Sequence, residues 1–273
     1  MVAKLSIWSQ YFYEMGPEDA VKEFIKCGIC CAELSDEHGH ELFERSDDPI
    51  ATGKAFAKFL KENNFEMLQG HLWLSIKICS DETAVSKLCK WIDMYEAIGI
   101  KNMVLHCDSM INSGLSVEEI ADKNIERLKI VAEHIKDKDI TICLENLGPK
   151  GPVRNADNIL YLIDKIGSDK FGVCLDTGHL NITDKNQTEF ILKAGKKLKA
   201  LHIADNQGET DQHWMPFAHG TVDFKAVVKA LREIDYNGYF NYEIPGESAH
   251  QSLEIRHAKI EYIKRCYDYL MAE

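Results

Sequence analysis

The sequence lacks the features of several large classes of protein. None of its apolar runs approaches the roughly 18 residues that a membrane-spanning helix needs, and Met1 is not followed by the apolar core of a secretion signal. The nine cysteines are an odd and scattered set, so they do not form a framework of paired disulfides. These absences predict a protein of the reducing cytoplasm that has no contact with a membrane.

Basic charge is also scarce. Lysine and arginine number 32 against 44 aspartates and glutamates, which leaves a net charge of −12. Such a chain has no general attraction to the phosphates of nucleic acids or to anionic lipids. The sequence does not favour a nucleic acid as partner.

No segment rich in proline, glycine or serine divides the 273 residues, so residues 1–273 are expected to form one domain. No Gly-x-Gly-x-x-Gly motif follows a predicted strand, which excludes a dinucleotide-binding Rossmann fold. The chain instead repeats a short apolar run followed by an amphipathic stretch, eight times. Eight βα units in a chain of this length predict an α/β fold, the closed (β/α)8 or TIM barrel.

The units are defined by their expected strands and helices. The predicted strands are Lys4–Trp8, Ile29–Leu34, Phe65–His71, Asn102–His106, Ile140–Glu145, Phe171–Asp176, Ala200–Ile203 and Tyr239–Glu243. The predicted helices are Pro17–Lys26, Ile50–Asn63, Glu82–Ala97, Ser116–Lys136, Asn155–Ile166, Thr188–Lys197, Phe224–Ile234 and Leu253–Leu270.

Seven of the eight predicted strands end in or beside a carboxylate or an imidazole. These residues are Glu33, His71, His106, Glu145, Asp176, His202 and Glu243. In a barrel the carboxyl ends of the strands meet on the face that carries the active site. Carboxylate and neutral imidazole together form the ligand set of Zn²⁺, Mn²⁺, Fe²⁺ or Co²⁺, and a bound cation offsets the repulsion among the carboxylates. The sequence therefore predicts a divalent metal site.

Two further segments add donor groups to this face. Asp176-Thr-Gly-His179 brings an imidazole close behind a strand-end carboxylate, across a tight turn that Gly178 is expected to allow. Asp211-Gln-His213 follows the strand that supplies His202, and in an extended loop its two side chains point to the same side. His71, His106, His179, Asp211 and His213 could therefore hold a second metal ion or contact the substrate.

The order of these segments resembles the xylose-isomerase-like TIM barrels. The resemblance rests on Glu145-Asn-Leu, Leu175-Asp-Thr-Gly-His179, Leu201-His-Ile-Ala-Asp-Asn206, Asp211-Gln-His213, His219-Gly-Thr-Val-Asp-Phe224 and Tyr242-Glu243. That superfamily contains sugar isomerases and epimerases, keto-inositol and dehydroshikimate dehydratases, and endonuclease IV-type apurinic endonucleases. The resemblance covers essentially the whole chain, and its motifs specify the superfamily better than they specify a reaction.

The resemblance to the ketose 3-epimerases implies a mechanism. Glu145, Asp176, His202 and Glu243 would hold one Mn²⁺, Zn²⁺, Co²⁺ or Mg²⁺ ion, and Glu145 and Glu243 would exchange a proton with a sugar through an enediolate. Substrate contacts are expected from Glu33, His179, Lys150 and Arg154, the last two as a site for a phosphate or carboxylate. Members of the superfamily often pair, so a homo-oligomer is expected.

The resemblance to endonuclease IV implies a larger site of two or three ions. Its nine ligands find matches in His71, His106, Glu145, Asp176, His179, His202, Asp211, His213 and Glu243. The chain departs from those nucleases after Glu145, where it has Asn-Leu-Gly-Pro-Lys-Gly in place of Asn-Thr-Ala-Gly-Gln-Gly. A sugar isomerase or epimerase is therefore expected first, a dehydratase or other lyase of a keto-polyol second, and a nuclease third. The sequence does not identify the sugar, its phosphorylation or the metal.

Overall fold

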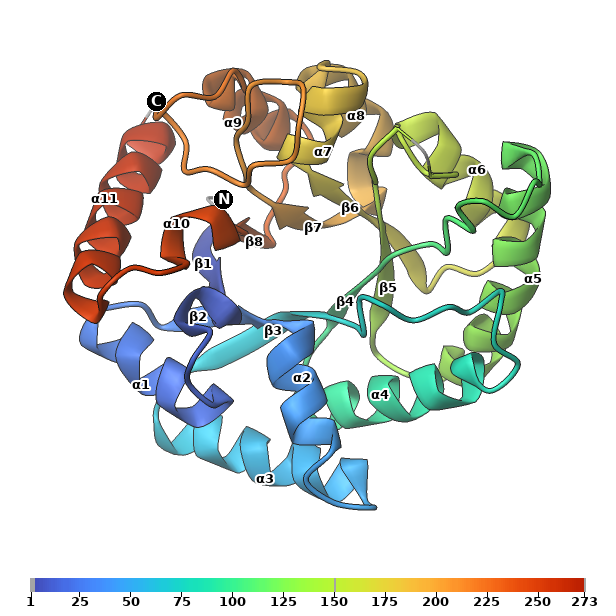
Figure 1. Cartoon of the computed structure of the whole chain (residues 1–273), viewed down its shortest axis with the longest axis horizontal. Helices are drawn as coiled ribbons and strands as arrows, with labels where there is room; N and C mark the ends of the chain where they lie inside the picture. Colours follow the sequence, from blue (N-terminus) through green and yellow to red (C-terminus); the bar gives the residue numbers. More distant parts are fainter. Residues whose placement is uncertain (1–2, 150, 273) are drawn as a thin grey trace.

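Eight parallel strands form the centre of the molecule in the computed structural model, which describes residues 3–149 and 151–272. The strands are β1 (Lys4–Trp8), β2 (Cys31–Leu34), β3 (Glu66–His71), β4 (Asn102–Leu105), β5 (Thr141–Glu145), β6 (Phe171–Asp176), β7 (Leu198–His202) and β8 (Tyr239–Tyr242). They pair in sequence order from β1 to β7, β8 pairs with β1, and a parallel bridge between Ile203 and Tyr242 joins the ends of β7 and β8. Figure 1 looks into the resulting nearly closed barrel.

Helices cover the outside of the barrel (Figure 1). The outer layer consists of α1 (Pro17–Lys26), α3 (Pro49–Glu62), α4 (Ala84–Ile98), α5 (Val117–Ile135), α6 (Ala156–Ile166), α8 (Gln187–Ala194), α9 (Phe224–Glu233) and α11 (Leu253–Ala272). Shorter helices follow the carboxyl ends of four strands: the 3-10 helix η1 (Ser9–Phe12), α2 (Asp36–Phe43), α7 (Thr177–Thr183) and α10 (Pro245–Ser248). A second 3-10 helix, η2 (Gly195–Lys197), precedes β7. No helix in the described ranges is long and apolar enough to cross a membrane.

Local sequence explains where these elements begin. Ser116 caps α5 by accepting the backbone N–H of Glu119, whose side chain in turn accepts the N–H of Ser116, a complete capping box. β6 is buried along its whole length, as expected for a strand covered by helices outside and side chains inside. The strand order and helix positions confirm the predicted (β/α)8 barrel.

A layer of small side chains in the barrel interior precedes the residues at the strand ends. Val104, Cys143, Cys174 and Ala200 form a separate buried cluster, one from each of four neighbouring strands. Each lies two positions before a predicted site residue, and side chains two apart in a strand point to the same side. The interior layer therefore fixes the inward direction of His106, Glu145, Asp176 and His202.

One expectation about local structure is wrong, and one helix was not predicted. The segment after Asp176 is the helix α7 and not a tight turn, because the Asp176 carboxylate caps the helix by accepting the N–H of His179 at 2.6 Å. The connection after β2 contains the unpredicted helix α2, in which Gly39 interrupts the expected helical pattern. A Cβ at Gly39 would lie 2.0 Å from the Tyr95 hydroxyl, so glycine is required there by close packing.

Candidate metal centre

Four side chains meet at the carboxyl ends of β5 to β8, as predicted. Glu145, Asp176, His202 and Glu243, here called the inner group, each offer a ligand atom within 4.8 Å of the others. The Nδ1 atom of His202 lies 3.2 Å from Glu145 Oε1 and 3.0 Å from Glu243 Oε2. The first three residues are at most 1% exposed, whereas Glu243 is partly accessible. The barrel therefore brings three carboxylates and one imidazole together in a buried position.

Two buried atoms of the inner group make no well-aligned hydrogen bond. They are Asp176 Oδ2 and His202 Nδ1. Leaving such atoms unsatisfied is costly, so an unpartnered pair at one site needs an explanation. Both are lone-pair donors of the kind that bind Zn²⁺ or Mn²⁺. The residues present thus fit a divalent metal ion.

Glu145 also belongs to a second cluster. His71, His106 and Glu145, here called the strand-3/4 group, offer ligand atoms within 4.8 Å of one another. Glu145 Oε2 lies 2.9 Å from His106 Nε2 and 3.5 Å from His71 Nε2. Since Glu145 Oε1 faces His202, the two oxygens of one carboxylate point to different groups. This is the arrangement of a carboxylate that can bridge two ions.

A third cluster joins α7, which follows β6, to the long connection after β7. His179, Asp211 and His213, here called the loop group, converge on one atom, because both Nε2 atoms lie 3.0 Å from Asp211 Oδ2. His213 has a left-handed backbone with φ of 48°, which is uncommon outside glycine and often marks a functional position. Asp211 and His213 thus meet, but not through the extended backbone that was expected.

Backbone carbonyls orient three of these histidines. Nδ1 of His71 donates to Leu72 O at 2.6 Å, that of His179 to Asn146 O at 2.9 Å, and that of His213 to Glu243 O at 3.0 Å. In each ring Nδ1 is thereby fixed as a donor, and Nε2 points into its cluster, where it would offer a lone pair to an ion after releasing its proton. Holding the far nitrogen of a ligating histidine is the usual way in which proteins prepare a metal site.

Burial and neighbouring charges shift the pKa values of residues in all three groups. Burial raises the pKa of Asp176 to about 6, against the lowering effect of His179 and His213. Burial would also raise the pKa of Glu243, but the adjacent His202 lowers this pKa to about 2. Burial disfavours the charged form of His71 and of His213, yet Glu145 raises the pKa of His71 to about 9 and Asp211 raises that of His213 to about 10. Without metal, protons balance the carboxylate charge.

The predicted substrate residues lie in different environments. Glu33 is fully buried and contacts His202 and Asn241, so its carboxylate lies behind His202. Arg154 is exposed on the connection after β5, and its backbone carbonyl accepts a hydrogen bond from Thr183. Lys150 lies outside the described residues.

Three residues of the site escaped prediction from the sequence. Asn146 accepts the Asp176 N–H at 2.8 Å and donates to the Asp176 carbonyl at 2.9 Å, which ties β5 to β6 beside the inner group. Cys174 offers a sulfur within 4.8 Å of ligand atoms of Glu145 and His202. Asn241 contacts Glu33. Alternation along the strands could have found two of them, since Cys174 and Asn241 each precede an inner-group residue by two positions.

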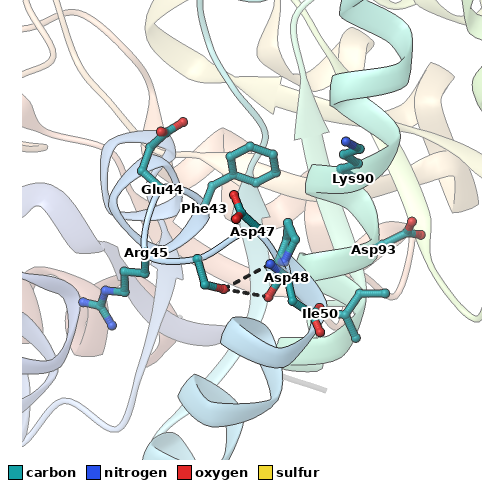
Figure 2. Close-up of a pocket in the computed structure, with 10 residues that line it drawn as sticks. Phe43, Glu44, Arg45, Asp47, Asp48, Ile50, Lys90 and Asp93 are labelled. Atoms are coloured by element: carbon teal, nitrogen blue, oxygen red, sulfur yellow. Dashed lines mark hydrogen bonds between the residues drawn. The ribbon is translucent and has the colours of Figure 1, made fainter.

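A surface cavity of about 590 Å³ lies elsewhere, between α4 and the connection from α2 to α3 (Figure 2). Its lining includes Arg45, Asp48, Lys90 and Asp93, and none of the predicted site residues. Arg45 pairs with Glu18 and Glu41, and Asp93 with His134 and Lys138. Arg45 and Asp93 are thus paired outside the cavity, and its lining includes no cluster of metal-ligand atoms within the described residues.

Comparison with known proteins finds similarity to both probable nucleases and epimerases. It is 35% identical to a "Probable endonuclease 4" of Metamycoplasma arthritidis over 207 residues, which cover 71% of this chain and 74% of that protein. It is 28% identical to an L-ribulose 3-epimerase of Methylomonas sp. over 210 residues, 72% of this chain and 70% of that protein. The match to the uncharacterized protein y4fM of Sinorhizobium fredii, at 30% identity, covers 68% of this chain and 59% of that longer protein.

Solved structures share the fold along its whole length. The D-psicose 3-epimerase of Clostridium cellulolyticum H10 with D-tagatose superposes with a TM-score of 0.82 at 15% identity, covering 98% of this chain and 99% of that one. The IolI protein with a binding zinc atom gives 0.78 at 17% identity, with 96% and 97% covered. The profile of the xylose isomerase-like TIM barrel matches residues 23–266. The chain belongs to the xylose isomerase-like TIM barrel family.

Proposed function

We propose that the protein is a metal-dependent sugar isomerase or epimerase that moves a proton beside the carbonyl of a ketose. The observation that carries the proposal is that two carboxylates contact the same atom of His202. Oε1 of Glu145 and Oε2 of Glu243 lie 3.2 Å and 3.0 Å from His202 Nδ1. Two carboxylates at one buried point, each able to hold a proton, are what a reversible proton transfer at carbon requires. The sequence relationship to an L-ribulose 3-epimerase supports the same reaction class.

A divalent ion held by the inner group would supply positive charge that offsets the developing enediolate. One glutamate removes the proton from the carbon next to the carbonyl, and the C–H electron pair moves into a carbon–carbon double bond while the carbonyl becomes an oxyanion. In an epimerisation the other glutamate returns a proton to the opposite face of that carbon. In an isomerisation it returns the proton to the neighbouring carbon, while the hydroxyl proton passes to the oxyanion and the new carbonyl forms. Reactant and product have the same composition, so no further reactant is needed.

The surroundings of the two glutamates suggest that each approaches the substrate from a different side. Glu145 is 1% exposed and lies within 3.5 Å of four imidazoles, those of His71, His106, His179 and His202. Glu243 is the more accessible carboxylate of the two. Glu243 is therefore proposed to meet the substrate from the open side of the site, and Glu145 from the enclosed side.

The charge of the surrounding loops favours a sugar over DNA. The connections from each strand to the next outer helix hold 17 Asp or Glu residues but five Lys or Arg residues, Arg45, Lys77, Lys150, Arg154 and Lys185. The longest connection, residues 203–223, has no basic residue at all. Since phosphate contacts provide much of the affinity for DNA, such a rim is a poor surface for a duplex.

The completeness of the three clusters favours a second candidate, an endonuclease IV-type nuclease. The strand-3/4 group and the loop group add five ligands to the inner group. Several ions held close together suit cleavage of a phosphodiester, because they can stabilise both the attacking and the leaving oxygen. The relationship to a probable endonuclease 4 supports this candidate.

One pair of assays separates the candidates. Protein loaded with Mn²⁺ or Zn²⁺ is incubated with a panel of ketoses and ketose phosphates in D₂O, and with a duplex that contains one abasic site. The proposal expects deuterium at the carbon next to the carbonyl of one ketose, and loss of the exchange when a chelator removes the metal. Cleavage of the duplex by the purified protein, without exchange into any ketose, would establish the nuclease instead.

A further inference from the structure

A chain of buried hydrogen bonds crosses the barrel interior to His202. The Ser6 hydroxyl donates to Asn241 Oδ1 at 2.8 Å, Asn241 Nδ2 donates to Glu33, and Glu33 Oε1 lies 3.0 Å from His202 Nε2. All four side chains are fully buried. They come from β1, β8, β7 and the carboxyl end of β2, so the chain joins strands that are distant in the sequence.

The chemistry of each group fixes the direction of this chain. An ionised carboxylate only accepts hydrogen bonds, so the amide nitrogen of Asn241 must face Glu33, and Nε2 of His202 must carry a proton. The remaining nitrogen of His202, Nδ1, then points at Glu145 and Glu243, and it is one of the two unpartnered atoms of the inner group. Glu33 thus decides which nitrogen of His202 is available to a metal ion.

His202 differs in this respect from the other oriented histidines. His71, His179 and His213 are each held by a neutral backbone carbonyl, whereas His202 is held by a carboxylate. A carboxylate behind a histidine makes the imidazole a stronger ligand as well as fixing its tautomer.

Stability alone does not account for Glu33. Burying a carboxylate is costly unless an opposite charge and hydrogen bonds compensate it. Within the described residues, the one ion pair of Glu33 is with His202, and no lysine or arginine takes part. The negative charge is therefore best explained by a positive charge on the other side of His202.

We infer that Glu33 is a positioning residue for the metal centre and does not contact the substrate. It holds His202 with Nδ1 directed at the inner group and strengthens the binding of a divalent ion there. This inference rests on the metal dependence proposed above. It gives Glu33 a different role from the substrate contact expected from the sequence.

The test is the variant Glu33→Gln, which keeps the shape of the side chain and removes its charge. The dissociation constant for Zn²⁺ is measured by competition with a chromophoric chelator, and we expect it to rise about 10- to 100-fold. Glu23→Gln is the matched control, because Glu23 is also buried and its Oε2 lies 3.1 Å from His257 Nε2, away from the site. The control should bind Zn²⁺ as the wild type does.

A measurement on the wild type makes the test independent of how well the variant folds. In the zinc-loaded protein, ¹⁵N NMR of the His202 ring should show a proton on Nε2 and metal on Nδ1, with assignment by the loss of these signals in His202→Asn. A proton on Nδ1, or unchanged Zn²⁺ affinity in Glu33→Gln, would overturn the inference. Unchanged affinity with a raised KM would also overturn it, in favour of a substrate contact.

These outcomes differ from a failure of the proposed function. If the wild type binds no Zn²⁺ at all, the metal-dependent reaction itself is refuted. Alternatively, the wild type binds Zn²⁺ and exchanges deuterium into a ketose. If Glu33→Gln then has the same Zn²⁺ affinity and the same exchange rate, only the role of Glu33 is refuted.

Discussion

The inner group and the loop group differ in how the chain builds them. Three of the four inner residues end strands, Glu243 directly follows β8, and only Glu243 is measurably accessible. The loop group depends on residues 203–223, and its side chains are 13 to 38% exposed. The barrel therefore dictates the first site, whereas the second depends on how one connection is folded and anchored.

This difference assigns separate roles. The inner group has the buried, unpartnered donor atoms that a metal ion would satisfy and the two glutamates that can transfer a proton. The loop group presents its donors at the more open side, where a substrate or a further ion can reach them. If the proposed reaction is correct, damage to the inner group should abolish turnover and damage to the loop group should only weaken it.

The largest effect is expected for Glu243→Gln. The amide cannot accept the proton from carbon, so kcat should fall by about 10² to 10⁴, the range for loss of a general acid or base. Glu66→Gln is the control, since Glu66 begins β3 at the opposite end of the barrel and pairs there with Lys4. A Glu243→Gln enzyme with kcat near that of the wild type would remove Glu243 from the chemistry.

A glycine in the connection after β7 allows a test of the loop group alone. A Cβ at Gly220 would lie 1.9 Å from the carboxylate of Asp205, which accepts the N–H groups of Asn206 at 2.9 Å and Val222 at 3.1 Å. Gly220→Ala should disturb this anchor and lower the free energy of unfolding by about 1–3 kcal/mol, the cost of leaving a buried donor unpaired. Thermal or urea unfolding measures it.

The informative measurement on Gly220→Ala is which of the two groups loses affinity for its metal ion or substrate. Metal or substrate affinity should fall at the loop group while the inner group keeps its ion. Gly148→Ala is the control, since a Cβ there meets no atom within 4 Å. Equal loss at both groups would show that the two are not built independently.

Metal binding should weaken as the pH falls. His71 and His213, with pKa values of about 9 and 10, hold protons at pH 7 in the metal-free protein and must release them to an ion. The dissociation constant should therefore rise about tenfold per displaced proton for each unit by which the pH falls. Metal binding by the inner group should weaken further below about pH 6, where Asp176 becomes protonated.

Chelator competition between pH 5 and 8 measures this dependence. Calorimetry in two buffers of different ionisation enthalpy counts the released protons directly. An affinity that does not change with pH would show that the imidazoles are not ligands.

The smallest effect is expected for Asp211→Asn. Asp211 contacts His179 and His213 and is not one of the two glutamates proposed to transfer the proton. Loss of one hydrogen-bonding partner of the substrate should raise KM about fivefold, or about 1 kcal/mol, and leave kcat within about twofold. Steady-state kinetics measures it, with the ketose that undergoes deuterium exchange in the assay proposed above. Complete loss of activity would favour the multi-metal nuclease, which needs all three groups.

The sequence predicted the barrel and its strand-end residues because both follow from short-range patterns. The bounds of β1 and β6 agree with prediction, and every inner-group residue lies at or directly after the end of its strand. Contacts across the barrel could not be predicted in this way. Glu33 and His202 are 169 residues apart in the sequence, and only the closed sheet shows that the end of β2 faces the end of β7.

The unpredicted helices have a similar cause. α2 contains a glycine and five charged or histidine residues among eight, a weak helical pattern that tertiary packing of Leu42 and His38 stabilises. α7 was not predicted because its capping residue, Asp176, is also the last residue of a strand and a predicted ligand. Where one residue has two structural roles, a pattern in the sequence reveals only one of them.

The central claim is that the inner group binds a divalent ion, and anomalous X-ray diffraction from crystals of the protein loaded with Zn²⁺ or Mn²⁺ tests it most directly. We expect an anomalous peak within bonding distance of Glu145, Asp176, Glu243 and the Nδ1 atom of His202. Peaks confined to the strand-3/4 group or the loop group, or no peak in protein saturated with metal, would contradict it.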